Sequence, residues 1–266
     1  MELPSPDSGM ARARLPVELM LHIVDCVLPA NPQALIPASH IATKTLLALT
    51  RVSRATPAAG RRAGVHASET LRRLVVQIPF GSLDPLDDHL NVRRTLRQGF
   101  EQLTRLEEFA CIGDYPALSV PDAHTDVWRL WPNLRRLALF GVPLDSHWLW
   151  WDIATLPELA HVVLARPQRA AEANIKDEYF HKLPRRDPRL ARDIKVLLLD
   201  TAYEIADLDT ARWKEIDPAG SMTVEVYEVP VPFYADEAPD QLVTAWVKRG
   251  ALDGTLWTWT GTKAGP

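Results

Sequence analysis

The sequence predicts an α+β protein in which a small all-helical module precedes an irregular α/β solenoid. Three observations lead to this prediction. Apolar residues recur about every fourth position between residues 15 and 28, which is typical of an amphipathic helix. After residue 65, four segments share the pattern Leu-x-x-apolar-x-apolar. The chain has 266 residues and is 47% hydrophobic and 24% charged, so it can bury a sizeable core.

The N-terminal part of the chain predicts a flexible tail followed by the helical module. Residues 1–13 mix Pro, Ser, Asp and Gly without a period, which indicates a tail. The module is expected over 14–64. Its first helix starts at Leu15-Pro16, because proline suits the first helical turn, and a second helix covers 44–54. We interpret the arginines at the end of this module as a solvated helix face rather than a phosphate site; they are Arg51, Arg54, Arg61 and Arg62.

The four repeated segments predict strands of a leucine-rich-repeat-like domain over residues 65–230. They cover residues 70–76, 103–111, 131–139 and 156–164. Their apolar spacing matches the strand of a leucine-rich repeat, although their period is irregular and the usual closing Asn or Cys is absent. Two further strands are expected at 194–199 and 222–229, the second as an edge or capping strand.

Helices are expected between these strands. Residues 91–105 predict an amphipathic helix with Arg93, Arg97 and other charged residues facing outward. A second helix is expected over 147–154, with Asp145 as its N-cap. The charged, proline-containing stretch 170–192 predicts a long exposed excursion.

The C-terminal residues 231–266 predict a capping segment. A last helix is expected from Asp240 to Arg249, ended by Gly250. The aromatic stretch Thr255–Trp259 is expected to fold back over the core.

Charge and cysteine content exclude several classes of function. Thirty Lys and Arg against 34 Asp and Glu give a net charge of −4, so we expect no nucleic-acid partner. No apolar run reaches the length of a membrane span, and the N-terminus carries no apolar stretch of a secretion signal. The two cysteines, Cys26 and Cys111, both fall in apolar patterns and suit a reducing compartment. We therefore expect an intracellular protein.

The N-terminal residues resemble the F-box. The resemblance is carried by Leu15-Pro-Val-Glu-Leu19 with Ile23, followed by Leu46, Leu49 and Val52-Ser-Arg54. F-box helices dock substrate receptors on the Skp-type adaptor of cullin–RING ubiquitin ligases. The remaining chain is similar to filamentous-fungal F-box proteins with a divergent leucine-rich region, on segments such as Trp131–Leu139 and Gly254–Trp259.

The resemblance implies a non-catalytic substrate-recognition subunit of a Skp–cullin–F-box ubiquitin ligase. Its adaptor-binding residues would be Leu15, Pro16, Leu19, Ile23, Leu49 and Val52. So short a module cannot bury both faces of its helices, so the remaining apolar stripe needs a partner. That partner is either the adaptor, and through it a cullin, or residues 71–110 of the same chain. The target protein and the residues that bind it are not identified by the sequence, nor is the choice between cytoplasm and nucleus.

Two departures from the F-box pattern support an alternative. The loop 29–43 is longer than the usual connection, and the chain passes from Arg62 to Leu71 where related sequences carry a third helix and a first repeat. The alternative is a protein-interaction scaffold with a truncated F-box and no ubiquitin-ligase role.

Catalytic and metal sites are weakly indicated, and we predict none, nor any cofactor. The densest polar cluster is Asp84, Asp87, Asp88 and His89, which we interpret as charges that stabilise a following helix rather than metal ligands. Asp207-Leu-Asp209 is a short match of the kind that arises by chance, and Cys111 occupies an inward strand position unsuited to a nucleophile. Five tryptophans lie between residues 128 and 151, and Trp150 is the one expected to be exposed.

Overall fold

The computed structural model describes residues 70–83, 92–120, 125–184, 187–201, 208–231 and 237–265. The expected tail and helical module, with all six predicted adaptor-binding residues, lie outside these ranges. The acidic cluster at residues 84–89 also lies outside them.

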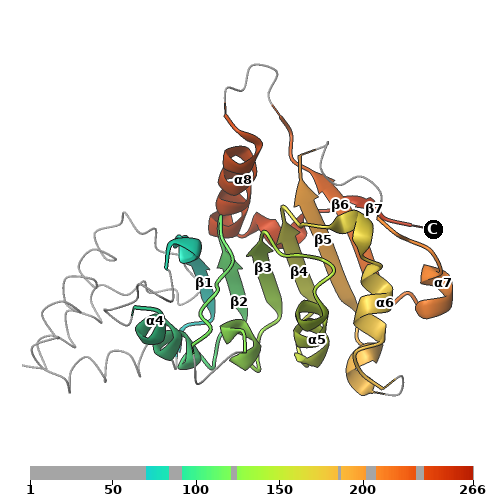
Figure 1. Ribbon diagram of the computed structural model, residues 1–266, viewed down its shortest axis with the longest axis horizontal. Helices are drawn as coiled ribbons and strands as arrows, with labels where there is room; N and C mark the ends of the chain where they lie inside the picture. The colour runs from blue at the N-terminus through green and yellow to red at the C-terminus, as the bar shows by residue number, and fades with distance from the viewer. Residues whose placement is uncertain are drawn as a thin grey trace, which may run out of the picture. The chain divides into compact units, whose positions relative to one another are not determined.

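Seven strands form one sheet in which each strand pairs with the next along the chain (Figure 1). The first six strands are parallel and the seventh is antiparallel to the sixth. The six predicted strands are confirmed, but β6 is an interior strand and the short β7 forms the edge. The strands are β1 (Arg73–Val76), β2 (Glu108–Cys111), β3 (Arg136–Phe140), β4 (His161–Ala165), β5 (Ile194–Asp200), β6 (Met222–Glu228) and β7 (Thr262–Lys263).

Helices connect the parallel strands, and a longer helix precedes β7. The α-helices are α4 (Val92–Glu101), α5 (His147–Thr155), α6 (Ile175–Phe180), α7 (Trp213–Ile216) and α8 (Pro239–Asp253). The 3-10 turns are η1 (Phe80–Ser82), η2 (Val127–Leu130), η3 (Ala170–Glu172), η4 (Pro188–Ala191) and η5 (Thr255–Thr258). None of these helices within residues 70–265, apart from the gaps given above, is long and apolar enough to cross a membrane.

Both faces of the sheet are buried. On β3, Leu137 and Leu139 point into a core shared with the connecting helices, while Ala138 and Phe140 point into a second core with α8 and η5. The same alternation continues in β4, where Val162 and Val163 face opposite cores. A parallel sheet with both faces covered defines the α/β class.

This arrangement corrects the expected fold class. The described part of the chain is α/β, not the α+β combination with a leucine-rich-repeat-like solenoid that the repeats predicted. The repeated apolar segments are strands of one twice-covered sheet: helix α8 and the aromatic turn η5 pack on the face opposite the connecting helices. The repeat pattern located these strands, but it did not determine what packs on their second face.

Two arginines of α4 are buried, although the helical pattern predicted that they face outward. Arg93 is 6% exposed and Arg97 is 2% exposed. The Arg97 guanidinium donates to the carbonyl oxygens of Leu118 (3.1 Å) and Thr125 (2.8 Å), and pairs with Glu101 at 2.7 Å. A guanidinium offers five donors, so it can satisfy several loop carbonyls that sheet pairing leaves unpaired.

Three other local predictions were wrong. The stretch 170–192 is not an exposed excursion, because it contains α6, whose Tyr179 is fully buried. Helix α5 is capped by the Ser146 hydroxyl, which accepts a hydrogen bond from the Leu149 amide, rather than by Asp145. Helix α8 continues through Gly250 and ends at Asp253, with Gly254 as its C-cap at a φ of 83°.

Gly250 does not end the helix. It allows close packing on the face of the sheet that α8 covers. A Cβ atom at this position would lie 2.3 Å from the Trp259 ring. The missing side chain therefore lets the tryptophan lie directly against α8. The aromatic stretch folds back over the sheet as expected: Leu256 is 1% exposed, and Trp257 Nε1 donates to Glu108 Oε2 at 3.1 Å.

The tryptophan expected at the surface is buried, and its neighbour is exposed. Trp150 is fully buried, and its Nε1 donates to the Leu144 carbonyl at 2.7 Å. Trp148 has 68% of its surface exposed. The buried positions of α5 are Leu149, Trp150, Asp152, Ile153 and Ala154, so the helix presents its opposite side to solvent.

We predict that these two tryptophans differ strongly in their contribution to stability. Trp150→Ala should lower the free energy of unfolding by about 3–5 kcal/mol, because it leaves a cavity and an unpaired carbonyl. Trp148→Ala is the matched control and should change it by less than about 0.5 kcal/mol. Urea denaturation followed by circular dichroism measures both values. Similar losses for the two variants would contradict the burial described here.

Candidate functional site

A hollow of about 640 Å³ opens at the carboxyl ends of the parallel strands. Open α/β sheets usually bind ligands outside this edge, where the strand order reverses. This sheet has no reversal, and the hollow instead lies between the loops after β2, β3 and β4 and the start of α8. Its lining residues are Gly113, Asp114, Tyr115, Phe140, Gly141, Arg166, Pro167, Gln168, Arg169, Ala170, Ala171, Glu172, Asp200, Asp240 and Thr244.

The loop after β4 brings two arginines into the lining with unusual backbone angles. Arg166 has a φ of 50° and Arg169 a φ of 56°, both in the left-handed region that non-glycine residues rarely adopt. The loop is held by its backbone: the Arg166 amide donates to the Leu199 carbonyl at 2.7 Å, and the Gln168 amide donates to the Val142 carbonyl at 2.9 Å. Each residue in this strained conformation costs about 1–3 kcal/mol of conformational free energy. The hydrogen bonds to Leu199 and Val142 therefore hold the loop in a conformation that it would not adopt alone.

The charges of the hollow are mixed, with carboxylates in excess. Four carboxylates, from Asp114, Glu172, Asp200 and Asp240, face two guanidinium groups. Arg166 Nε lies 4.0 Å from Asp200 Oδ1 and has no hydrogen-bond partner among the described residues. Arg169 points to the loop before α5, where it pairs with Asp145 at 2.8 Å. The hollow is therefore polar and, counting lining side chains, acidic.

A hydrogen-bonded network extends from Tyr115 of the hollow into the helix layer. The Tyr115 hydroxyl donates to Asp126 Oδ2 at 2.6 Å and accepts from Trp128 Nε1 at 3.3 Å. Burial raises the pKa of Tyr115, and the nearby Asp126 carboxylate raises it further. The pKa of Asp126 is also raised by burial, against the lowering effect of the Tyr115 hydrogen bond. The tyrosine thus stays a neutral donor that fixes the wall of the hollow.

Asp152 of α5 is the most strongly perturbed carboxyl next to this network. Burial raises its pKa to about 6, although its ion pair with Arg129, at 3.0 Å, opposes the rise; the charge of Asp126 adds to it. The side chain of Asp152 is only 5% exposed. The ionised form of Asp152 is therefore destabilised, because little water can solvate its charge.

The thiol nearest to this region is buried and held protonated. Cys111, at the end of β2, is fully buried, as predicted, and burial raises the pKa of its thiol far above the ordinary value. A thiol held protonated in this way is a weak nucleophile. Among the residues that the structure describes, no three His, Cys, Asp or Glu side chains are grouped so that they could hold a metal ion.

Few of the polar residues named in the sequence analysis lie within the part of the chain that the structure describes. Asp207 lies outside the described residues, whereas Asp209 accepts hydrogen bonds from the Ala211 amide and Asn174 Nδ2. It therefore holds a turn. The arginines of the β4 loop went unnoticed in the sequence. A left-handed backbone conformation can be predicted from the sequence where the residue is glycine or asparagine, because these residues adopt it readily. An arginine gives no such indication.

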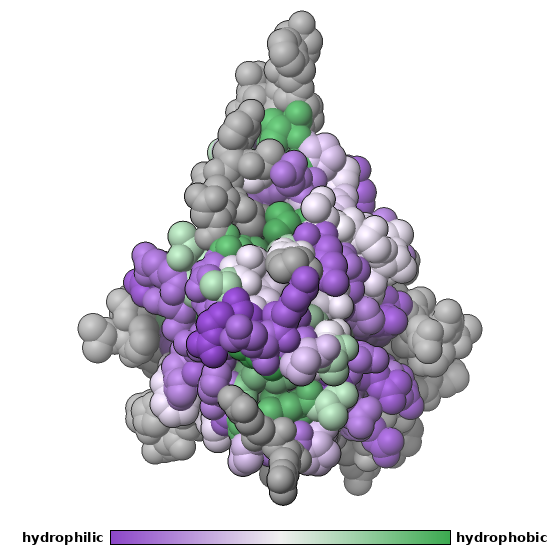
Figure 2. All heavy atoms as spheres, turned by 90° about the vertical axis from the view of Figure 1, so that its right-hand side faces the viewer, coloured by the Kyte–Doolittle hydropathy of each residue, from purple (hydrophilic) through white to green (hydrophobic). Residues whose placement is uncertain are grey.

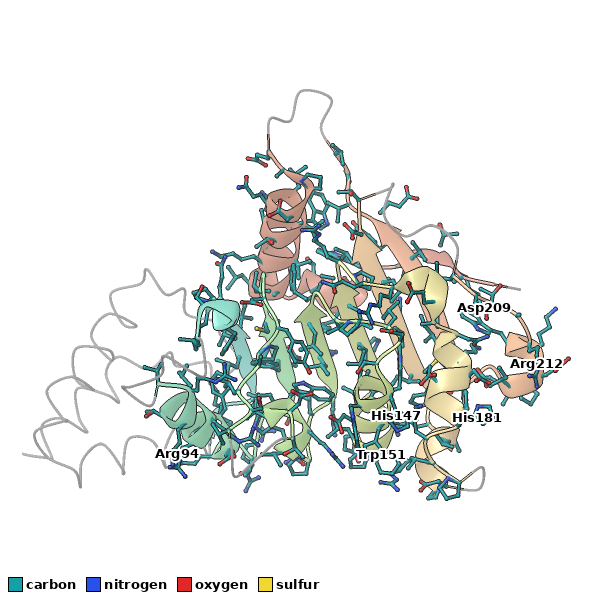
Figure 3. The ribbon with its side chains drawn as sticks, in the orientation of Figure 1. Arg94, His147, Trp151, His181, Asp209 and Arg212 are labelled. Carbon is teal, nitrogen blue, oxygen red and sulfur yellow. The ribbon has the colours of Figure 1, made fainter. Side chains whose placement is uncertain are left out.

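Exposed side chains of α5 form a second feature that the sequence did not identify. His147 and Trp151 lie on this helix beside α6, which leads into His181 (Figure 3). The His147 ring contacts Trp148 edge to face, with centroids 5.4 Å apart, and His147 Nδ1 lies 2.6 Å from Lys182 Nζ. Of these residues, His147 and Trp148 precede the buried positions of α5 and are exposed, whereas Trp151 is half-buried and packs against the core.

Comparison of the chain with protein-family models, with curated proteins and with solved structures finds no match.

We predict that the strain at Arg166 is measurable through a matched pair of substitutions. Arg166→Gly and Arg166→Ala remove the same guanidinium, but only glycine adopts a φ of 50° without strain. The glycine variant should therefore be more stable than the alanine variant by about 1 kcal/mol. Chemical denaturation of both proteins gives the difference. An alanine variant that equals or exceeds the glycine variant would show that the backbone here is unstrained.

We predict that Asp152 makes stability depend on pH between about 4 and about 6. The folded protein binds this proton more tightly than the unfolded chain, so the resulting stabilisation is complete below the ordinary pKa of 3.8 and is lost as the pH rises through about 6. Each pKa unit corresponds to about 1.4 kcal/mol, so the loss is about 3 kcal/mol. Asp152→Asn should remove this part of the pH profile. Parallel profiles for parent and variant would contradict the assignment.

Proposed function

We propose that this protein is a non-catalytic substrate-recognition subunit of a Skp–cullin–F-box ubiquitin ligase. The N-terminal helices would dock on the adaptor, and the seven-stranded domain would bind a target protein. The adaptor half of the proposal is supported by the Leu15-Pro-Val-Glu-Leu19 and Val52-Ser-Arg54 motifs. The target half is supported by the hollow at the carboxyl edge of the sheet.

Target binding is supported mainly by the positions of the charged side chains around that hollow. They come from loops after β2 and β4, from the end of β5 and from the first turn of α8. Loops fixed on a rigid, twice-covered sheet hold such side chains in place before a partner arrives. Complementary charge at such a surface gives specificity and a fast encounter rather than bond chemistry.

The proposed mechanism is an increase in effective concentration. A target held by the sheet domain, on a chain whose N-terminal helices hold the adaptor, meets the ubiquitin-carrying machinery within one assembly. The transfer step then behaves as an intramolecular reaction. The chain itself needs neither a nucleophile nor a cofactor for this role. The proposal implies a location inside the cell, in the cytoplasm or the nucleus.

The second candidate function is a protein-interaction scaffold without a ubiquitin-ligase role. It is favoured by the short join between Arg62 and Leu71, where related F-box sequences carry a third helix. In this case the apolar residues of the module would pack on the chain itself. The two functions differ in one measurable property, which is adaptor binding.

We predict that the full chain binds the Skp-type adaptor of its host in a pull-down from purified components. The triple variant Leu15→Ala/Pro16→Ala/Ile23→Asp should lose this binding, because it removes the apolar stripe that the adaptor would cover. Trp148→Ala is the matched control, since it deletes an exposed aromatic residue of the sheet domain and should leave adaptor binding intact. Absence of binding by a folded parent chain would overturn the ligase proposal in favour of the scaffold.

A further inference from the structure

A row of charged side chains crosses the sheet at the amino ends of the strands, opposite the hollow of the candidate site. Parallel pairing sets one residue of each strand in register, and these residues are Arg73, Glu108, Arg136, His161 and Lys195. Each lies two positions before a residue of the core that α8 and η5 cover, so all five lie on that face of the sheet. Figure 2 is viewed from the side toward which the row ends, that of β6 and β7, and shows hydrophilic side chains across its middle.

Opposite charges alternate along the first part of this row. Glu108 bridges two arginines: its Oε2 lies 2.6 Å from Arg73 Nε, and its Oε1 lies 2.6 Å from Arg136 Nη1. The two arginines belong to strands that are two strand spacings apart, or about 10 Å. A carboxylate midway between two cations of this row therefore pairs with both, one oxygen to each.

The alternation stops at His161. This residue lies between Arg136 and Lys195, which are again two strands apart, at the position where a carboxylate would continue the pattern. Lys195 is held on its other side, because its Nζ pairs with Glu225 at 2.9 Å and donates to the Trp259 carbonyl at 3.0 Å. Neither ring nitrogen of His161 makes a hydrogen bond to another residue that the structure describes.

Positive charge prevails at the His161 ring. Burial lowers the pKa of His161, and the charges of Arg136 and Lys195 lower it further. The carboxylates of Glu108 and Glu225 belong to β2 and β6, on the far sides of these two cations, so they do not cancel the positive charge at the ring. An anion at this position would therefore be attracted by both neighbours.

Hydrogen-bond donors remain open to solvent beside this ring. The Arg136 side chain is 40% exposed, and Glu108 engages only its Nη1. A guanidinium carries five donors, so others are left for a ligand. His161 itself is half-buried, and one nitrogen of a neutral imidazole is a donor.

We propose that Arg136, His161 and Lys195 bind a carboxylate group of a ligand, which lies between the two cations as Glu108 lies between Arg73 and Arg136. The His161 ring would donate a further hydrogen bond to it. Hydrogen bonds between such charged groups are about twice as strong as neutral ones. A free small acid and an acidic side chain of a protein carry the same group, and the site would recognise what they share. This inference does not rest on the proposed function, because the site lies at the opposite ends of the strands from the target-binding hollow and involves no adaptor.

The test is a nuclear magnetic resonance titration of the full chain with sodium acetate and with a Gly-Glu-Gly peptide blocked at both ends. The His161 ring signal is assigned by its loss in His161→Gln. It should shift and saturate, and binding should be about three-fold or more tighter at about pH 6 than at about pH 8, because a bound anion favours the protonated ring and the two equilibria are linked. The charged groups that face the ring from the neighbouring strands, Arg136, Lys195, Glu108 and Glu225, keep their charges over this range.

Sodium chloride at the same ionic strength is the control for this titration. It screens the two cations equally, but a chloride ion has no second oxygen with which to bridge them. Binding of acetate alone would restrict the site to free small acids, and binding of the peptide would extend it to acidic side chains of proteins. Equal responses to acetate, peptide and chloride, or no response to either carboxylate, overturn the proposal.

Two variants assign the binding to this row. Arg136→Gln and Lys195→Gln should each weaken the carboxylate by at least about ten-fold, because each removes one of the two cations. Arg135→Gln is the matched control: this neighbouring arginine pairs with Glu158 at 3.8 Å instead, and its loss should leave the affinity unchanged. Circular dichroism verifies that each variant is folded. Parent-like affinity in both Arg136→Gln and Lys195→Gln overturns the proposal.

Discussion

The constraint on which the rest of the structure depends is the burial of a mainly parallel sheet on both faces. Parallel strands need long connections, and the connecting helices cover only one face here. The second face carries Ala138, Phe140 and Val163, which water would otherwise contact. Helix α8 and the aromatic turn η5 cover it, and the absence of a side chain at Gly250 lets Trp259 approach the helix closely. The C-terminal segment is therefore a structural layer of the domain.

Covering the sheet in this way buries polar backbone groups, and arginines satisfy many of them. Arg97 binds carbonyl oxygens of the connection between β2 and β3. Arg192 plays a similar part near the end of α5, where it donates to the carbonyls of Ile153 at 2.7 Å and Ala154 at 3.2 Å. The last carbonyls of a helix have no partner within it, so a guanidinium there supplies what a C-cap would. These hydrogen bonds offset the cost of burying the guanidinium charge.

The same layering explains where charge remains available to a partner. Inside the domain, ion pairs such as Lys176–Asp217 close on themselves, because an unpaired buried charge is costly. At the carboxyl edge of the sheet the ion pairs lie nearer to solvent, as between Arg169 and Asp145, whose side chains are 59% and 30% exposed.

The sequence by itself located the strands, because short runs that are apolar at every position, such as Leu137-Ala-Leu-Phe140, recur between turn signals and are typical of buried strands. It also determined α4 and α5, whose apolar periodicity is local. The repeat spacing predicted a solenoid, but the same spacing also fits a sheet that is covered on both faces. Only the tertiary structure decided between them, because the second face is covered by residues about a hundred positions away in the chain. It also decided which α4 arginines are buried, which tryptophan is exposed and how Arg166 is oriented, since each depends on long-range contacts that local patterns do not encode.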